Sequence, residues 1–337
     1  MSRDKVFIIA EAGVNHNGDL GLARRLIEVA AEAGADAVKF QLFKADSLAT
    51  KSAGLAAYQA QQVADGGQHE MLRRLELSRE AHAELMDYAR SKGIIFLSSP
   101  FDVDGIGFLS KLGLPLLKVP SGEIVNLPYL RELARTGLPV ILSTGMANMN
   151  EIGAAIEALE EAGLPRASLT VLHCTTEYPT PLEEVNLQAM LTIRDKFNVR
   201  VGYSDHTPGV EVSILAVAMG AQVIEKHFTL DQTMEGPDHQ ASLSPQELHA
   251  LVAGVRRAEM IRGDGVKTPT PSEARNIPIV RKSIVTARPI RKGELLTAEA
   301  LTTKRPGTGV SPMRWDQMVG RPAKRDYLAD ELIDDPT

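Results

Sequence analysis

Two histidines, each at the end of a short β-type run, are the residues of this sequence best placed to hold a metal ion. His206 follows one run and His227 closes the next. If these runs are neighbouring parallel strands, both imidazoles project from one edge of a sheet. Either histidine alone could be an ordinary half-buried side chain, but the pair at matching strand ends favours a metal site. Two imidazoles with water, Glu11 or a substrate oxygen suit octahedral Mn2+ or Mg2+, and Asp238 could hold a metal-bound water.

Two lysines, Lys39 and Lys118, lie inside apolar β-type runs. A charged side chain in such a run is costly unless it meets an anion. With hydroxyl groups at the ends of other runs, these lysines predict a cradle for phosphate and carboxylate groups. Any single polar run end could instead be a turn or cap residue. The polar residues at run ends are Glu11, Gln41, Ser99, Ser121, Glu123, Ser143, Thr144, Thr175, Thr176, Ser204 and Glu225.

Eight β-type runs alternate with segments whose apolar residues recur at helical spacing. This alternation indicates parallel strands with right-handed crossovers, and eight such units close into a (β/α)8 barrel with its site at the carboxyl ends of the strands. An open doubly wound sheet is the alternative, but the segment AGVNHNG (12–18) lacks the glycine spacing of a dinucleotide site. The runs are Val6–Glu11, Ala37–Gln41, Ile94–Ser99, Leu116–Val119, Val140–Thr144, Leu169–Cys174, Val201–Ser204 and Gln222–His227.

The overall composition limits the possible partners. A chain of 337 residues has room for one large domain and a small one. Its net charge of -6 argues against nucleic acid or an anionic membrane surface as the main partner. The first residues become acidic too soon for a signal peptide, and the longest apolar stretch, 212–224, is shorter than the ~20 residues of a membrane span.

The lone cysteine and two of the other histidines have structural interpretations. Cys174 closes an apolar run, which favours a packed thiol over a nucleophile. Because it has no partner for an internal disulfide, it fits a reducing compartment, and we expect a cytoplasmic protein. His82 and His249 lie in helix-like segments and are expected to face solvent.

The composition changes after residue 262, where the predicted barrel domain (1–262) ends. Residues 263–280 predict a linker, and residues 281–337 predict a small β-rich domain. The small domain holds 11 Lys and Arg against 8 Asp and Glu, a net charge of +3, which leaves -9 on the rest of the chain. Its loop Lys304-Arg305-Pro306-Gly307 presents a guanidinium group on a rigid turn, which suits a sugar or carboxylate partner. A solvated charge pair in a hairpin is equally compatible with this loop.

Seven short motifs resemble, in order and over essentially the full length, the sialic acid synthase family of bacterial nonulosonic acid synthases. They are IAEAGVNHNG (9–18), VKFQ (38–41), KVPSGE (118–123), LSTGM (142–146), HCTTEYP (173–179), YSDHT (203–207) and EKHFT (225–229). The segment from about Lys282, with its KRPG loop (304–307), resembles the antifreeze-like SAF domain of that family. The resemblance implies a TIM barrel followed by a small β-rich SAF domain.

The resemblance implies a condensation of phosphoenolpyruvate with the open-chain aldehyde of an N-acetylated mannosamine-type sugar, with release of phosphate. His206 and His227 would ligate a divalent metal, Mn2+ ahead of Mg2+ or Co2+, that polarises the aldehyde oxygen. Glu11 and Glu123 would steer water and stabilise a cation at C2. The residues expected to bind the substrates are Lys39, Gln41, Ser99, Lys118, Ser121, Ser143, Tyr178, Ser204, Asp238 and Arg305.

The same resemblance bears on assembly and on the acceptor sugar. In the family, the arginine matching Arg305 reaches the active site of the partner subunit, so a domain-swapped homodimer is expected. Thr176 and Glu177 stand where members that use N-acetylmannosamine commonly have Asn, and the segment 56–69 contains no Asn. These departures favour the legionaminic acid branch, whose acceptor is 2,4-diacetamido-2,4,6-trideoxymannose.

Three alternatives remain open at this stage. The first is an N-acetylneuraminate synthase that acts on N-acetylmannosamine. The second is another phosphoenolpyruvate–aldose synthase, which would need a further phosphate site for its sugar. The third is a non-catalytic sugar-binding protein, which would bind its ligand without turnover and without sensitivity to EDTA.

Overall fold

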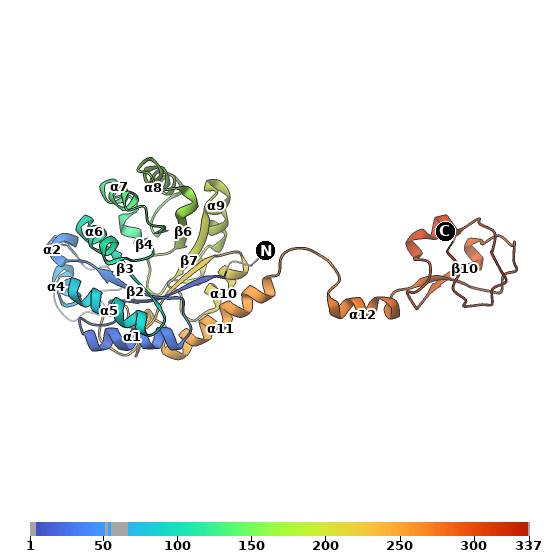
Figure 1. The fold of residues 1–337 in the computed structure, drawn as a ribbon, viewed down its shortest axis with the longest axis horizontal. Helices are drawn as coiled ribbons and strands as arrows, with labels where there is room; N and C mark the ends of the chain where they lie inside the picture. The colour runs from blue at the N-terminus through green and yellow to red at the C-terminus, as the bar shows by residue number, and fades with distance from the viewer. Residues whose placement is uncertain (1–4, 51–52, 55–66, 336–337) are drawn as a thin grey trace. The chain divides into compact units, whose positions relative to one another are not determined.

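The computed structural model describes residues 5–50, 53–54 and 67–335. The chain divides into two compact units, Met1–Gly263 and Asp264–Thr337 (Figure 1). Of the segment 56–69, whose lack of Asn bears on the acceptor sugar, residues 56–66 lie outside the described residues.

The first unit is the predicted barrel of parallel strands. Neighbouring strands follow the order β3-β2-β1-β8-β7-β6-β5-β4, and the sheet closes where β3 and β4 lie side by side. Every run predicted from the sequence forms a strand, with its ends shifted by no more than two residues. The strands are β1 (Phe7–Gly13), β2 (Ala37–Leu42), β3 (Ile95–Pro100), β4 (Leu117–Val119), β5 (Val140–Ser143), β6 (Leu169–Cys174), β7 (Arg200–Asp205) and β8 (Val223–His227).

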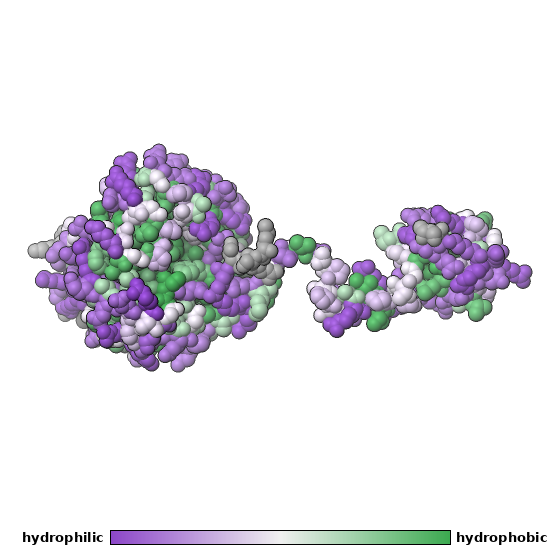
Figure 2. All heavy atoms as spheres, in the orientation of Figure 1, coloured by the Kyte–Doolittle hydropathy of each residue, from purple (hydrophilic) through white to green (hydrophobic). Residues whose placement is uncertain are grey.

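Helices connect these strands and cover the barrel (Figure 1). Several begin at a residue whose side chain caps the helix, as Asn148 does in a capping box with Glu151. Hydrophilic residues lie at the rim of this unit and hydrophobic ones nearer its middle on the face in Figure 2. The helices are α1 (Leu20–Glu32), α2 (Ala45–Leu48), α4 (Gln68–Arg74), α5 (Arg79–Ser91), α6 (Val103–Leu112), α7 (Leu127–Arg135), α8 (Met149–Glu161), α9 (Leu187–Phe197), α10 (Glu211–Ala218) and α11 (Pro245–Arg262). Short 3-10 turns are η1 (Ser121–Glu123), η2 (Arg166–Ser168), η3 (Leu182–Glu184) and η4 (His239–Ala241).

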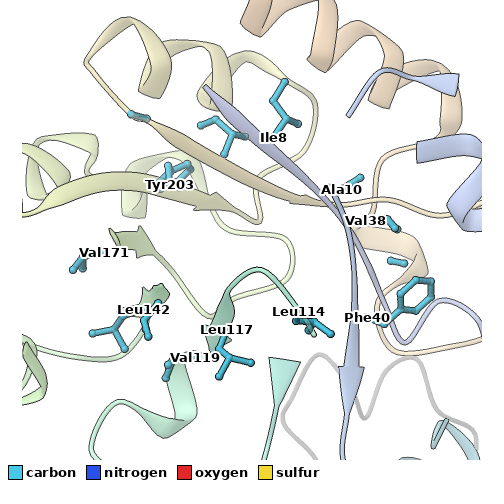
Figure 3. Packing of buried hydrophobic residues seen from close by; sticks show 14 of the residues in the cluster. Ile8, Ala10, Val38, Phe40, Leu114, Leu117, Val119, Leu142, Val171 and Tyr203 are labelled. Carbon is cyan, nitrogen blue, oxygen red and sulfur yellow. The ribbon is translucent and has the colours of Figure 1, made fainter. Parts of the chain in front are cut away.

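Side chains alternate between the two faces of each strand, and this alternation separates the core from the site. Outer residues such as Ile8, Val38 and Phe40 pack with the helices in the main hydrophobic cluster (Figure 3). The inner apolar residues form a smaller cluster of Ile9, Ala37, Leu97, Ile141, Leu172 and Val223. Two positions further along the same strands, the inward-facing residues are Glu11, Lys39, Ser99, Ser143, Cys174 and Glu225. The barrel interior is therefore apolar at one level and polar at its carboxyl-terminal mouth.

His82 contradicts the expectation that it faces solvent. It is fully buried on α5, because it shares the inner helix face with Leu85 and Ala89. Its ring nitrogens lie 2.9 Å from the carbonyl oxygen of Ser78 and 3.1 Å from Ser98 Oγ. His249 on α11 is exposed, as predicted.

The second unit has its own small core. Strand β9 (Ser283–Thr286) pairs antiparallel with β10 (Leu301–Lys304), and buried residues such as Ile284, Ile290 and Tyr327 form the core. Short elements η5 (Ala298–Ala300), η6 (Pro312–Arg314) and α13 (Trp315–Met318) complete it. The segment predicted as a linker contains a helix, α12 (Pro271–Val280). Among the described residues, no helix of either unit combines the length and the apolar character needed to cross a membrane.

Candidate active site

Most of the predicted site residues converge on one cavity of about 550 Å³ at the carboxyl ends of the barrel strands. This volume suits a small-molecule ligand. All of the predicted residues except Glu123 and Arg305 line it. The predicted residues that line the cavity are Glu11, Lys39, Gln41, Ser99, Lys118, Ser121, Ser143, Tyr178, Ser204, His206, His227 and Asp238.

The two remaining predicted residues have contacts of their own. Glu123 ends η1 and accepts a hydrogen bond of 2.6 Å from Asn126 Nδ2. Arg305 belongs to the second unit, directly after β10, where it is exposed and its Nε donates to the carbonyl oxygen of Val280 at 3.0 Å. Lys304, beside it, forms an exposed ion pair with Asp330. Lys304 thus forms the solvated charge pair that was one of the two interpretations of this loop. The Arg305 guanidinium itself has no acidic partner among the described residues.

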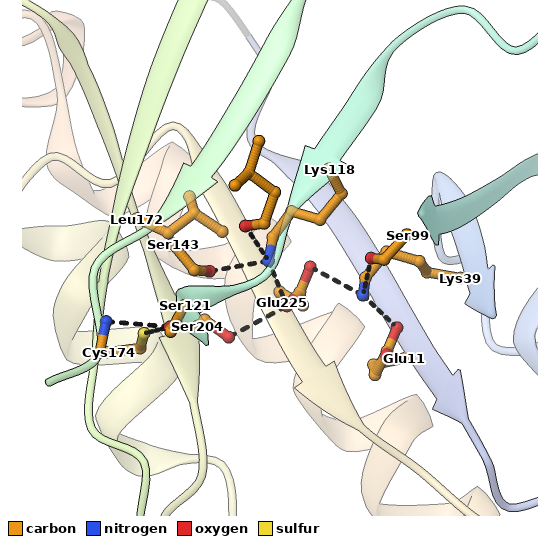
Figure 4. A network of polar contacts seen from close by, with 12 residues as sticks. Glu11, Lys39, Ser99, Lys118, Ser121, Ser143, Leu172, Cys174, Ser204 and Glu225 are labelled. Atoms are coloured by element: carbon orange, nitrogen blue, oxygen red, sulfur yellow. Dashed lines mark hydrogen bonds and ion pairs between the residues drawn. The ribbon is translucent and has the colours of Figure 1, made fainter. Parts of the chain in front are cut away.

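Lys39 is held by three groups inside the barrel (Figure 4). Its Nζ lies 2.9 Å from Glu11 Oε2, 3.0 Å from Ser99 Oγ and 3.7 Å from Glu225 Oε2. The side chain is only 4% exposed. Burial lowers the pKa of Lys39, but the carboxylates of Glu11 and Glu225 outweigh it and raise the pKa above its ordinary value. Lys39 therefore stays positively charged.

Lys118 approaches the carboxylate of Glu225 from the side opposite to Lys39. Its Nζ donates to Ser143 Oγ at 2.7 Å and lies 3.4 Å from Glu225 Oε1. Glu225 Oε1 also accepts a hydrogen bond of 3.1 Å from Ser204. Burial lowers the pKa of Lys118. Glu225 thus bridges the two lysines (Figure 4), and we call the three residues Lys39, Glu225 and Lys118 the charged row.

The two buried glutamates differ in their charge state. Burial raises the pKa of Glu11 to about 7. Burial would also raise the pKa of Glu225, but the ammonium groups of Lys118 and Lys39 outweigh it and lower that pKa to about 2. Glu225 is therefore ionised at neutral pH, whereas Glu11 exchanges a proton near neutrality. A carboxyl group with such a pKa can act as a general acid or base at physiological pH.

Glu225 is a site residue that the sequence analysis did not select. It was noted only as a polar residue at a strand end. The argument applied to the lysines, that a charge inside an apolar run needs a partner, applies equally to Glu225, which lies two positions before His227 on the same inner face.

The two histidines lie side by side at the mouth. Their ring centroids are 5.5 Å apart, and the ring of Tyr178 lies 4.1 Å from that of His206 at a tilt of 32°. The Nδ1 atom of His206 lies 2.5 Å from the carbonyl oxygen of Thr175, which leaves its other ring nitrogen for a ligand. Burial lowers the pKa of His206 to about 4 and that of His227 as well. Both imidazoles are therefore neutral at pH 7, the form that binds metal ions.

These histidines fit a metal with open coordination positions. The Nδ1 atom of His227 is buried and has no hydrogen-bond partner among the described residues, and Asp238 Oδ2 lies 3.9 Å from it. In the described ranges, no three His, Cys, Asp or Glu side chains form a group that could hold a metal ion. An ion bound by His206 and His227 would therefore take further ligands from water or from a substrate.

One wall of the cavity is apolar and was not identified from the sequence. It is formed by residues of α2, α4 and the turn after β3, which carry no motif. These residues are Leu48, Met71, Leu72, Leu75 and Phe101. Cys174, predicted as a packed thiol, is buried with its Sγ 3.3 Å from Ser121 Oγ.

Comparison with known proteins agrees with this architecture. Residues 26–267 match the NeuB family, and residues 281–336 match the SAF domain. The chain is 53% identical over 330 residues to an N,N'-diacetyllegionaminic acid synthase of Campylobacter jejuni, covering 98% of this chain and 99% of the relative. It is 49% identical over 317 residues to an N,N'-diacetyllegionaminic acid synthase of Legionella pneumophila, covering 93% of this chain and 89% of the relative.

A similar solved structure is the N-acetylneuraminic acid (sialic acid) synthetase of Leptospira borgpetersenii in complex with citrate. It matches with a TM-score of 0.73 and 37% identity, over 81% of this chain and 90% of that chain. The resemblance predicted from the motifs is thereby confirmed, and the chain belongs to the NeuB family, with a SAF domain at its C-terminal end.

Proposed function

We propose that this protein condenses phosphoenolpyruvate with 2,4-diacetamido-2,4,6-trideoxymannose to give N,N'-diacetyllegionaminic acid and phosphate. The observation that best supports the reaction is the buried charged row beside two neutral histidines in one cavity. The choice of acceptor is supported by the names of the two relatives that cover nearly the whole chain. The apolar wall agrees with a sugar that carries a methyl group in place of its 6-hydroxyl.

Phosphoenolpyruvate would bind over the charged row. Lys39 and Lys118 supply two ammonium groups, and the hydroxyl groups of Ser99 and Ser143 lie within 3.0 Å and 2.7 Å of them. Ionised donors of this kind form short, strong hydrogen bonds with phosphate and carboxylate oxygens. Glu225 holds both lysines in place and limits the positive charge of the site before the substrate arrives.

The reaction forms one carbon–carbon bond and consumes one water. C3 of phosphoenolpyruvate attacks the aldehyde carbon, water adds at C2, and phosphate leaves as the 2-keto acid forms. A divalent cation, Mn2+ ahead of Mg2+ or Co2+, would be held by His206 and His227 and would polarise the aldehyde oxygen. Glu11 is suited to take the proton of the added water, because burial raises its pKa to about 7. Glu123 stays a prediction for this role.

We also propose a cytoplasmic homodimer in which Arg305 completes the site of the partner subunit. The arginine is exposed on a turn after β10, which leaves its guanidinium available to a ligand. The lone cysteine supports a reducing compartment.

Phosphate release tests the reaction class. The full-length protein is incubated with Mn2+, phosphoenolpyruvate and the diacetamido sugar, and phosphate is measured with and without EDTA. We expect release that requires the sugar and stops with EDTA. Sugar binding without any release of phosphate would instead support a non-catalytic sugar-binding protein.

A further inference from the structure

A buried ion pair lies one residue before each of the two histidines. Asp205 is the last residue of β7, Lys226 is the last but one of β8, and the two are partners in the parallel register. Lys226 Nζ lies 2.9 Å from Asp205 Oδ2, and the two side chains are 1% and 0% exposed. Neither residue lines the cavity. The proposed reaction uses neither of them.

The pair stands directly behind the site, on the outer side of the barrel wall. Ser204 and Glu225, one position earlier, face inward, where their side chains are joined by a hydrogen bond of 3.1 Å. Because successive side chains alternate, Asp205 and Lys226 face outward. The two histidines, one position later, are again on the inner side.

The ion pair is tied to the residue that follows His206. Asp205 Oδ1 accepts hydrogen bonds from the backbone N of Thr207 at 2.9 Å and from its Oγ1 at 2.7 Å. Lys226 Nζ donates to the carbonyl oxygen of Thr207 at 2.5 Å. Ser213 on α10 donates to Asp205 Oδ2 at 2.5 Å. The residues before and after His206 are therefore both fixed to Lys226, the neighbour of His227.

Stability alone does not account for charged residues at this position. A buried ion pair is often no more stabilising than apolar residues of the same size, and most side chains packed on the outer face of the barrel are apolar. The pair does, however, join the ends of β7 and β8 by directional bonds. We propose that Asp205 and Lys226 are positioning residues that set the separation of His206 and His227, and with it the affinity for the metal ion.

This inference rests on the metal role given to the histidines in the proposed function. It is tested by Mn2+ binding to the metal-free full-length protein, followed by the electron paramagnetic resonance signal of free Mn2+. The variant Asp205→Asn/Lys226→Met removes the charges with little change in size. We expect its Kd for Mn2+ to rise by about 10- to 100-fold, the usual effect of losing a residue that orients a metal ligand. Affinity for phosphoenolpyruvate without metal should stay within about threefold of wild type, because the charged row is intact.

A matched control is the part-buried pair at the opposite end of the barrel. Asp36, directly before β2, lies 2.6 Å from Arg256 Nη2 and accepts a hydrogen bond from the backbone N of Ile8. Asp36→Asn/Arg256→Met should leave the Kd for Mn2+ unchanged. If the double variant of the proposed pair does not fold, the nearly isosteric Thr207→Val takes its place, with a several-fold rise in Kd expected.

The outcomes separate the inference from the proposed function. Wild-type protein that binds no divalent cation would overturn the metal role of the histidines and this inference with it. If wild type binds Mn2+ and the folded double variant binds it with the same Kd, the positioning role alone is overturned. The same holds for Thr207→Val if it has to replace the double variant. An equal loss of affinity in the Asp36/Arg256 control would show a general effect of instability and would also overturn it.

Discussion

Replacement of Lys118 by methionine removes one cation of the charged row while it keeps the length of the side chain. In the wild type, Lys118 bonds to Ser143 and shares Glu225 with Lys39. After the change, Glu225 keeps Lys39 at 3.7 Å and the hydroxyl group of Ser204 at 3.1 Å. The carboxylate of Glu225 therefore keeps two partners, and the variant should fold. Its free energy of unfolding should fall by less than about 3–5 kcal/mol, the cost of a buried charge left without any partner.

The expected effect on substrate binding is much larger. Truncation of one partner of a buried, hydrogen-bonded charge pair costs about 2–5 kcal/mol in binding. Since every 1.4 kcal/mol changes a dissociation constant tenfold, the Kd for phosphoenolpyruvate should rise by about 30- to 4,000-fold. The net charge of the site also becomes less positive, because the charges of Glu225 and the remaining Lys39 cancel. Glu11, when ionised, then adds a negative charge that repels the anionic substrate.

Isothermal titration calorimetry measures the Kd, and thermal unfolding checks the fold. The matched control is Lys111→Met, which removes an exposed lysine near the end of α6 and should leave the Kd unchanged. A folded Lys118→Met protein that binds phosphoenolpyruvate within threefold of wild type would refute the assignment of the charged row as the anion site.

Three further predictions address the carboxylate, the metal and the assembly. Burial raises the pKa of Glu11 from 4.5 to about 7, so the stability gained by protonating Glu11 is complete below pH 4.5 and is lost as the pH rises through about 7. In denaturant titrations, the free energy of unfolding of wild type minus that of Glu11→Gln should therefore fall between these pH values. A difference that does not change with pH would contradict the raised pKa. His227→Ala should lose Mn2+ binding and nearly all turnover with its far-UV circular dichroism unchanged; a retained metal-dependent rate would show that the metal lies elsewhere. Arg305→Ala should use the sugar poorly and bind phosphoenolpyruvate normally. Its co-expression with His227→Ala should restore activity, because one active site of a domain-swapped mixed dimer then has both wild-type residues. No recovery of activity would argue against the exchange of SAF domains between subunits.

Much of the fold was predictable because it depends on local periodicity. Short β-type runs separated by segments of helical spacing indicate the strands of the barrel, and they place Lys39 and Lys118 within strands. His82 was misassigned because its exposure depends on which face of α5 packs inward, and a polar side chain on the inner face interrupts the apolar pattern. The ion pair of Asp205 and Lys226 could not be predicted from either strand alone, because it follows from the register between β7 and β8.

The apolar wall of the cavity was less accessible to sequence reasoning than its two lysines. A buried lysine is an unusual residue whose presence itself needs an explanation, whereas the apolar wall consists of residues such as Met71 and Leu75 that also occur in any core. Only the assembled barrel shows that these side chains border the cavity.

The most direct test of the central claim is a competition between two acceptor sugars. The full-length protein receives Mn2+, phosphoenolpyruvate and equal concentrations of 2,4-diacetamido-2,4,6-trideoxymannose and N-acetylmannosamine, and mass spectrometry measures the two nine-carbon acids. We predict that N,N'-diacetyllegionaminic acid is the main product. N-acetylneuraminic acid as the main product, or no nine-carbon acid from either sugar, would contradict the proposed function.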